Sequence, residues 1–447
     1  MDNYYYGDHP LPFVTKAHNS KMHDEFRTLL EDSRSNFMRL IVDATEERLK
    51  VEGFRLSAST DTRSDQASWD IWQANGMDSE SQTAFIEALI KGVAYVSVWY
   101  PEAGGEYAQI QIEDPLQTIV AYVPGTNFRR RAAALKVWRD EWTGYDRANV
   151  YLAAGNPDWP AGIYKYQAST SQVQHFLGTP AQQALSEVVY GQGWEEIPDS
   201  FVENPLGIVP IIPLRNRPRL LLEGESEIAD VYRIQNQING FLFLLAIAGY
   251  FGAHRQRWAV GMSLMVDESG KPAFDIAVDR LIVSENPQTT FGDFAQTDLA
   301  GYISAIDQKI QHLAITTRTP KHYLLPTGQE PSGDALNAAE SGLVKKVERK
   351  QRPFGEGLEE ALRLARLFQG SADAPVDSEL VWAPAATPTV AEVTDAVIKR
   401  FLAGLIPWET SIEDLGYTQT QLARMLQQFN DLPPSAPVPT GSVGVRG

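Results

Sequence analysis

A run of thirteen residues that is apolar almost throughout constrains this chain more than any other segment. The run, FLFLLAIAGYFGA, extends from Phe241 to Ala253. It is shorter than the roughly 18–20 residues that a helix needs to cross a bilayer, so we predict a buried helix and no membrane partner. Because the run is apolar on nearly every side, it must be covered on several sides, either by its own chain or by neighbouring subunits.

The charge of the chain limits the partners that it can hold tightly. Its 447 residues carry a formal net charge of −18, and 43% of them are hydrophobic, enough for a sizeable core. An acidic surface repels nucleic acid at long range, so we expect any DNA contact to be local and weak. The absence of cysteine removes disulfides, thiolate metal sites and a cysteine nucleophile.

The first half of the chain changes from a helical to a strand-like period. Apolar spacings predict a helix over Asp24–Val51 and two short helices over 67–92, broken at Asn75-Gly76. From residue 92 to about Trp194, β-branched and aromatic runs with Gly and Pro between them predict a β-rich module. The segment 204–218 is too rich in proline for a central strand or a helix, which favours an extended connector.

The second half returns to helices. Apolar stripes predict them at Glu225–Tyr250, Thr297–Thr316 and Asp334–Phe368, with a short strand-like segment, Arg255–Asn286, between the first two. Pro353 lies inside the third stripe and predicts a kink near Arg349–Pro353. Two or three small helices are expected after residue 387, and the Pro/Gly/Ser-rich end is expected to be disordered.

No segment carries a recognisable catalytic signature. The chain lacks a phosphate-binding G-x-x-x-x-G-K-[ST] loop, an H-E-x-x-H pair, an EF-hand loop and a G-x-S-x-G elbow. The seven histidines are scattered and no pair of carboxylates stands out as a general acid and base. We therefore predict a protein that is not an enzyme and that holds no metal and no cofactor.

Two basic clusters stand out against the acidic whole. TTRTPKHYLLPTG, Thr316–Gly328, is a proline-bracketed segment before a Lys/Arg-rich helix, and 318–352 holds seven Lys/Arg against four acids. This local reversal favours a surface that faces a polyanion, and the alternative is an exposed helix face with i,i+4 ion pairs. Arg129–Arg131 begins a strand-like stretch, and is either a solvated strand edge or a contact with an acidic neighbour.

The order of these parts, together with several stretches, resembles the portal proteins of tailed, long-tailed (siphovirus-type) bacteriophages. The stretches are YYYGDHPLPF, NFMRLIVDATEERLKVEGFRL, GIVPIIPLRNRP followed by GESEIADVYRIQNQIN, and PWETSIEDLGYTQTQLARM. The resemblance extends from about Tyr4 to Phe429. It implies an α+β portal-type fold with a β-rich wing, two stem helices, a small α/β clip, a tunnel loop, a long kinked helix and a helical crown.

The resemblance also implies a division of the chain. The expected segments are a wing at 1–223, stem helices at 224–254 and 294–317, a clip at 255–293, a tunnel loop at 318–332, a kinked helix at 333–370, a crown at 385–430 and a disordered tail at 431–447. Portal proteins form rings, usually of twelve subunits, at one capsid vertex, and DNA is packaged and ejected through the hole. Implied partners are therefore other copies of the chain, double-stranded DNA, the terminase large subunit, a head–tail adaptor, and the major capsid and scaffolding proteins.

The resemblance assigns residues to two surfaces and places the protein in the virion, and in the host cytoplasm during assembly. The expected channel residues are Lys321, His322, Tyr323, Lys345, Lys346 and Arg349. The expected partner-binding residues of the clip are Arg255, Arg257, Trp258 and Lys271.

Other classes of protein remain open from the sequence. A collar, adaptor or capsid protein would share a ring or shell but lack two long helices around a small α/β insert. An enzyme with a dispersed site would show a deep polar pocket and perturbed titratable groups within one subunit. An ordinary nucleic-acid-binding protein is disfavoured by a sequence pI near 4.9.

Overall fold

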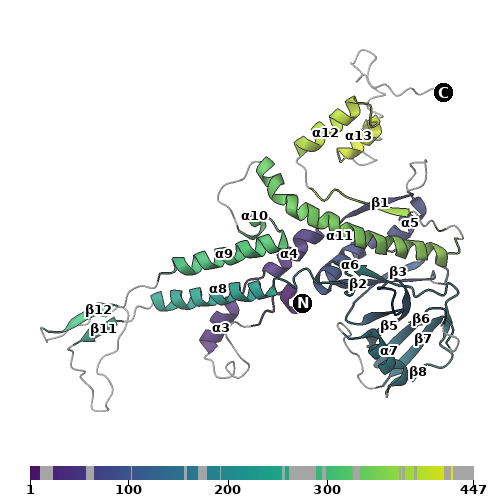
Figure 1. Cartoon of the computed structure of the whole chain (residues 1–447), viewed down its shortest axis with the longest axis horizontal. Helices are drawn as coiled ribbons and strands as arrows, with labels where there is room; N and C mark the ends of the chain where they lie inside the picture. Colours follow the sequence, from purple (N-terminus) through teal and green to yellow (C-terminus); the bar gives the residue numbers. More distant parts are fainter. Residues whose placement is uncertain are drawn as a thin grey trace.

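The computed structural model confirms a mixed α+β chain and is elongated, with a helical hairpin that leaves a broad body (Figure 1). It describes residues 1–10, 24–56, 65–101, 103–155, 159–169, 179–191, 193–253, 257–260, 288–293, 298–325, 333–371, 374, 378–386, 390–416 and 424–425. The expected tail at 431–447 lies outside the described residues.

The N-terminal part holds α1 (Asp2–Tyr6), α3 (Asp24–Asp32) and α4 (Phe37–Glu46). The single helix expected over Asp24–Val51 is wrong, because the chain breaks between α3 and α4. The side chain of Asn36 accepts hydrogen bonds from the backbone N–H groups of Met38 and Arg39 and so begins a new helix. The two helices expected next are confirmed as α5 (Gln66–Ala74) and α6 (Met77–Lys91), divided at Asn75-Gly76.

The β-rich region forms two antiparallel sheets. The first has the strand order β10-β2-β3, and the second has the order β4-β5-β6-β7-β8 with β9 paired to β7. Their bounds are β2 (Val93–Trp99), β3 (Gln109–Glu113), β4 (Thr118–Tyr122), β5 (Arg131–Asp140), β6 (Tyr145–Leu152), β7 (Gly162–Ala168), β8 (Glu195–Glu196), β9 (Val202–Glu203) and β10 (Ile211–Arg215). Helix α7 (Ala181–Tyr190) packs on the second sheet through Ala184 and Val188.

Two expectations for this region are corrected. The proline-rich segment contains a true strand, β10, which tolerates Pro213 because it lies at the edge of its sheet. Arg131 does not lie on a sheet edge, because β5 runs between β4 and β6. Its guanidinium is buried and pairs with Glu360 of the long helix at 2.6 Å, so the acidic neighbour of this arginine is in the same chain.

The longest helix, α11 (Gly333–Phe368), holds the body together. Its buried side chains at Leu343, Val347, Phe354 and Leu358 belong to the main core, and Phe354 stacks on Phe85 of α6 at 5.2 Å between ring centroids. The helix continues through Pro353, and Figure 1 shows it bend along its length. Strand β13 (Ser378–Trp382) then pairs with β1 (Val51–Leu56), which joins parts of the chain more than 300 residues apart.

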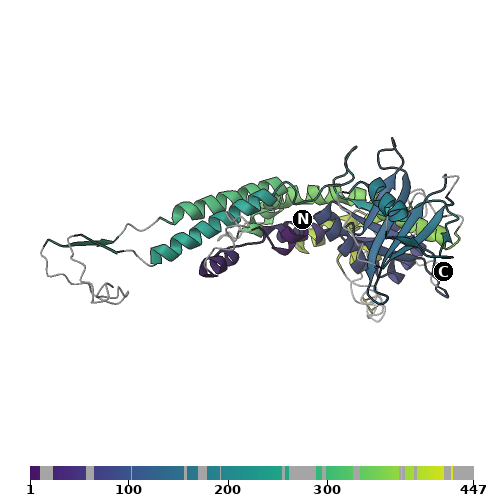
Figure 2. The same cartoon turned by 90° about the horizontal axis from the view of Figure 1, so that it is seen from below.

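The remaining elements extend from this body. Helices α8 (Tyr232–Ala253) and α9 (Ala300–Thr317) lie side by side (Figure 1 and Figure 2) and end in a hairpin of β11 (Arg257–Val260) and β12 (Thr290–Asp293). A short helix, α10 (Lys321–Leu324), follows α9. Helices α12 (Val390–Leu402) and α13 (Trp408–Asp414) lie at the top of Figure 1. They are two of the small helices expected after residue 387.

Helix α8 begins at Tyr232, seven residues after the expected start. The preceding residues are held by backbone contacts that a helix would not allow: Glu225 N–H donates to Asn216 O at 2.8 Å and Glu227 N–H donates to Leu89 O at 2.7 Å. These bonds anchor the entry to α8 on the segment after β10 and on α6, so packing and not apolar spacing decides where the helix starts.

We predict that Glu46→Gln stabilises the protein above pH 7. Burial, and then the charges of Asp43 and Glu47, raise the pKa of Glu46 to about 7, and a negative charge in the last turn of α4 also opposes the helix dipole. The native state therefore holds a proton that the unfolded chain releases near pH 4.5, and wild-type stability falls as pH rises from 4.5 to 7.

The glutamine variant does not lose stability in this way. Its free energy of unfolding should equal that of the wild type at pH 4.5 and exceed it by about 1 kcal/mol at pH 8, a figure that allows for the partial exposure of the side chain. Thermal unfolding at the two pH values measures it. An advantage that does not change with pH would contradict the assignment.

Candidate functional site

Helix α8 is the predicted all-round apolar helix, and its own chain covers only part of it. Along the helix, Ile238 is fully buried, whereas Phe241, Leu242 and residues 244–249 are only half-buried. Its companion α9 exposes two isoleucines on the described surface, Ile303 at 51% and Ile315 at 75%. A pair of helices that leaves this much apolar surface exposed is typical of an element buried by association.

The basic turn after α9 is compact. Arg318 ends α9 in a left-handed conformation with φ of 54°, and Pro320 begins the single turn of α10. Thr319, Pro320 and Leu324 are buried. The expectation of a loop whose middle, KHYLL, projects from the subunit is therefore wrong for residues 322–325, because Leu324 is held in the core and, of the five residues, Lys321 alone is exposed. The rest of the expected tunnel loop, 326–332, lies outside the described residues.

Two of the predicted channel residues in this turn contact a buried ion pair. Arg48 pairs with Glu340 of α11 at 3.0 Å and donates to the Tyr323 hydroxyl at 3.0 Å and to the carbonyl of Ala385 at 2.8 Å. His322 Nε2 lies 3.6 Å from Glu340 Oε1. Both rings are half-buried, while Lys321 is exposed. Arg48 thus ties the turn to α4, α11 and the residues that precede α12.

The three predicted channel residues of α11 divide between its two faces. Lys345 is exposed and pairs with Glu348 at 2.7 Å, and Arg349 is also exposed. Lys346 points the other way and is 5% exposed, which leaves it no route to a phosphate in the channel. The placement of Lys346 on a channel surface is therefore wrong within the subunit described here.

The partner of Lys346 is Glu227, a fully buried carboxylate that the sequence analysis did not single out. Lys346 Nζ lies 3.4 Å from Glu227 Oε1 and donates to the carbonyl of Thr317 at 2.9 Å. Lys350 donates to Glu227 and Asn216, and Arg217 lies 3.2 Å from Glu227 Oε1. The carboxylate thus joins the entry to α8, α11 and the residues after β10. Through Lys346 this cluster also holds the end of α9.

The electrostatics of this cluster keep its carboxylate ionised. Burial alone would raise the pKa of Glu227, but Lys350, Lys346 and Arg217 hold its pKa below the ordinary value. Burial lowers the pKa of Lys350 to about 8 and lowers the pKa of Lys346. The spacing of Lys346 and Lys350 within the apolar stripe of Leu343 and Val347 is the sequence signal that indicates their burial.

Two of the four predicted clip residues lie among the described residues. Arg257 and Trp258 lie in β11, paired with Asp293 and Gly292 of β12 at the tip of the hairpin. Arg255 and Lys271 lie outside the described residues. Partner binding by these four residues stays a prediction.

A metal or membrane site does not emerge from the part of the chain that the structure describes. Among those residues no three metal-ligating side chains converge, and no helix is both long and apolar enough to cross a bilayer. A cavity of about 390 Å³ lies between the β4–β5 turn and the segment after β10. Its partly buried carboxylate, Glu223, is already engaged by Tyr122, Tyr95 and Arg215.

Comparison with known proteins agrees with this arrangement. Residues 1–430 match the family described as "Phage portal protein, SPP1 Gp6-like". The chain is 32% identical over 413 residues to the portal protein of Mycobacterium phage D29, with 87% of this chain and 77% of the relative covered. The portal protein of Mycobacterium phage L5 is 31% identical with the same coverage. The chain belongs to the phage portal protein family, a family of structural components of the virion, which confirms the resemblance.

We predict that Glu227→Gln destabilises the protein severely. The neutral amide leaves Lys346 and Lys350 without a compensating charge in the interior, a change that typically costs about 3–5 kcal/mol. The matched control is Glu348→Gln, which removes a carboxylate from the exposed pair with Lys345 and should cost less than about 1 kcal/mol. Chemical denaturation of both variants measures the difference, and equal effects would contradict the structural role of Glu227.

Proposed function

We propose that this portal protein acts as a closed ring of twelve copies, through which double-stranded DNA enters and leaves the capsid. The observation that carries the proposal is the half-covered apolar hairpin of α8 and α9, in a chain whose family works at the capsid vertex. Packing each hairpin against the hairpins of two neighbours removes this surface from water, and each Å² so buried contributes about 25 cal/mol.

The segments of the fold then acquire roles in the ring. We assign the wing to residues 1–223, the stem to α8 and α9, the clip to 255–293 and the crown to 385–430. Strands β11 and β12 lie at the end of the α8–α9 pair that is far from the body in Figure 1, which favours a docking place for exchangeable partners, first the terminase motor and then a head–tail adaptor. The energy for packaging would come from that motor, since no phosphate-binding loop occurs in this sequence.

The charge of the subunit suits a passage through which DNA slides. A formal charge of −18 per copy repels the duplex from most of the surface. Lys321, Lys345 and Arg349 are exposed, so they remain candidates for brief contacts with passing phosphates, which are weak and depend on salt. Lys346 is removed from this set because Glu227 holds it.

We predict that the double variant Ile303→Asp/Ile315→Asp folds but fails to close a ring. Both side chains are exposed in the subunit, so the substitutions should change its folding stability little. Burying unpaired charges between neighbouring subunits is costly and should prevent assembly. The matched control is Ser304→Asp/Thr316→Asp, which places the same charges at the next positions of α9, both exposed. Native mass spectrometry should show rings for the wild type and the control, and smaller species for the isoleucine variant. A wild type that stays monomeric at micromolar concentration would contradict the proposal.

We predict that Lys321→Glu/Lys345→Glu gives normal rings that package or retain less DNA. Both side chains are exposed, so the fold should tolerate the change, while phosphates would meet added negative charge. The control, Arg55→Glu/Lys399→Glu, makes the same change in net charge at exposed positions elsewhere. DNA content per particle is the measurement. Equal packaging by both variants would show that Lys321 and Lys345 do not contact DNA.

A further inference from the structure

One tryptophan is presented to solvent at the tip of the β5–β6 hairpin. Trp142 is 98% exposed, which is unusual for the largest apolar side chain. The tip is rigid, because the Asp140 carboxylate accepts hydrogen bonds from the backbone N–H groups of Trp142 and Thr143 and from the Thr143 hydroxyl. Arg147 of β6 lies 3.5 Å from the same carboxylate. The subunit therefore fixes an aromatic side chain that it does not itself bury.

A cavity large enough for an indole lies at the other end of β5. Its volume is about 390 Å³, and it is lined by Asn127, Phe128, Arg129, Arg215, Pro218, Arg219, Leu220, Leu222 and Glu223. Leu220 is 74% exposed and the neighbouring Leu221 is 89% exposed, so the wall continues outward as an apolar rim. Aromatic side chains that fill apolar pockets next to arginine are frequent anchors of protein interfaces.

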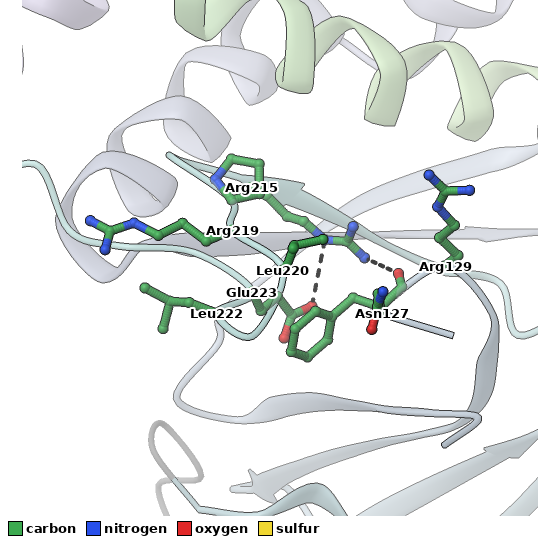
Figure 3. Close-up of a pocket in the computed structure, with 9 residues that line it drawn as sticks. Asn127, Arg129, Arg215, Arg219, Leu220, Leu222 and Glu223 are labelled. Carbon is green, nitrogen blue, oxygen red and sulfur yellow. Dashed lines mark hydrogen bonds and ion pairs between the residues drawn. The ribbon is translucent and has the colours of Figure 1, made fainter. Parts of the chain in front are cut away.

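The cavity is preformed in the isolated subunit. Arg215 donates to the Phe128 carbonyl at 2.7 Å and lies 3.9 Å from the partly buried carboxylate of Glu223, as the dashed lines in Figure 3 show. Asn127 and Phe128 both adopt left-handed backbone conformations, with φ of 49° and 61°. Such conformations persist in residues other than glycine only where the surroundings hold them, and they gather at binding sites. Phe128 is held further by an edge contact with Tyr122.

Charge on the two surfaces is complementary. Glu141 is exposed beside Trp142 at the hairpin tip. Two arginines line the cavity and extend to opposite sides of it in Figure 3, Arg219 and Arg129. A tip with a tryptophan and a carboxylate therefore fits a pocket that is lined by both polar and apolar side chains and carries two arginines, of which Arg219 also pairs with Glu225 at 2.8 Å.

The tip of one subunit cannot reach its own cavity. The two features lie at opposite ends of β5, a ten-residue strand, and a strand of this length spans about 33 Å. The strand is fixed between β4 and β6 along its length. An occupant for the cavity must therefore come from another molecule.

We propose that in the ring the hairpin tip of each subunit inserts Trp142 into the cavity of the next subunit, with Glu141 facing Arg219 or Arg129. The inference rests on the proposed ring. Closed rings need two different complementary patches on each subunit, in contrast to dimers with two-fold symmetry.

Cross-linking tests the contact directly, because the chain has no cysteine of its own. The variant Glu141→Cys/Leu221→Cys keeps Trp142 and the lining leucines, and a short bis-maleimide reagent joins the two new thiols only between subunits. Assembled rings should give a denatured ladder that continues beyond the dimer, whereas either single-cysteine variant should stop at the dimer. Adding Trp142→Ala to the double variant should abolish the ladder.

The outcomes separate this inference from the ring on which it rests. Rings seen by native mass spectrometry that give no ladder would overturn the contact but leave the ring in place. Absence of rings in the wild type would overturn both.

A second measurement uses the uncross-linked protein. Trp142→Ala should raise the concentration at which rings dissociate at least tenfold, while Tyr190→Ala, which removes an aromatic that is 76% exposed on α7, should not change it. Equal effects of the two substitutions would overturn the proposal.

Discussion

The arrangement of the subunit depends on the ion pairs that the buried carboxylate of Glu227 makes with Lys346, Lys350 and Arg217. The backbone of Glu227 is tied to Leu89 at the end of α6, and its side chain holds Lys346 and Lys350 of α11 and Arg217 after β10. Through Lys346 it also reaches Thr317, the last residue of α9. Buried ionic networks add little net stability compared with an apolar core, but one geometry alone satisfies all their members. The direction in which the hairpin leaves the body follows from this cluster.

The subunit therefore consists of a firmly packed body and a hairpin that is fixed at its base but incompletely covered. In the body, α11 packs against both helices and strands, and Arg131 and Arg48 add buried ion pairs at two further points along it. In the hairpin, the half-buried residues of α8 have no further cover from the described part of the chain. This division suits a ring in which neighbours supply the missing contacts while each body keeps its own shape.

Much of the fold could be predicted from the sequence where local patterns decide the outcome. The bounds of α9, α11 and the division between α5 and α6 follow from apolar spacing and from Asn75-Gly76. The predicted bounds were wrong where a contact with a residue far away in the sequence determines where an element begins. The start of α8 is set by backbone bonds to α6 and to the segment after β10, the break before α4 by the cap of Asn36, and the strand β10 by its place at a sheet edge. Pairing of β1 with β13 joins segments that no local pattern connects.

The candidate site was harder to predict, because charge in a sequence does not reveal exposure. Lys345, Lys346 and Arg349 form one basic cluster by composition, yet the helix turns Lys346 inward to Glu227. His322 and Tyr323 look like parts of a projecting loop, yet Leu324 holds the turn in the core and Arg48 contacts Tyr323. Family resemblance supplied the function, whereas the residues that organise the site became visible only from the packing of the chain.

The most direct test of the account is an electron cryo-microscopy reconstruction of the purified wild-type protein viewed down its axis. The account predicts a closed ring with a central channel, in which α8 and α9 of each subunit pack against the same helices of both neighbours. A compact monomer, or a ring in which these two helices face solvent instead of neighbouring subunits, would contradict it.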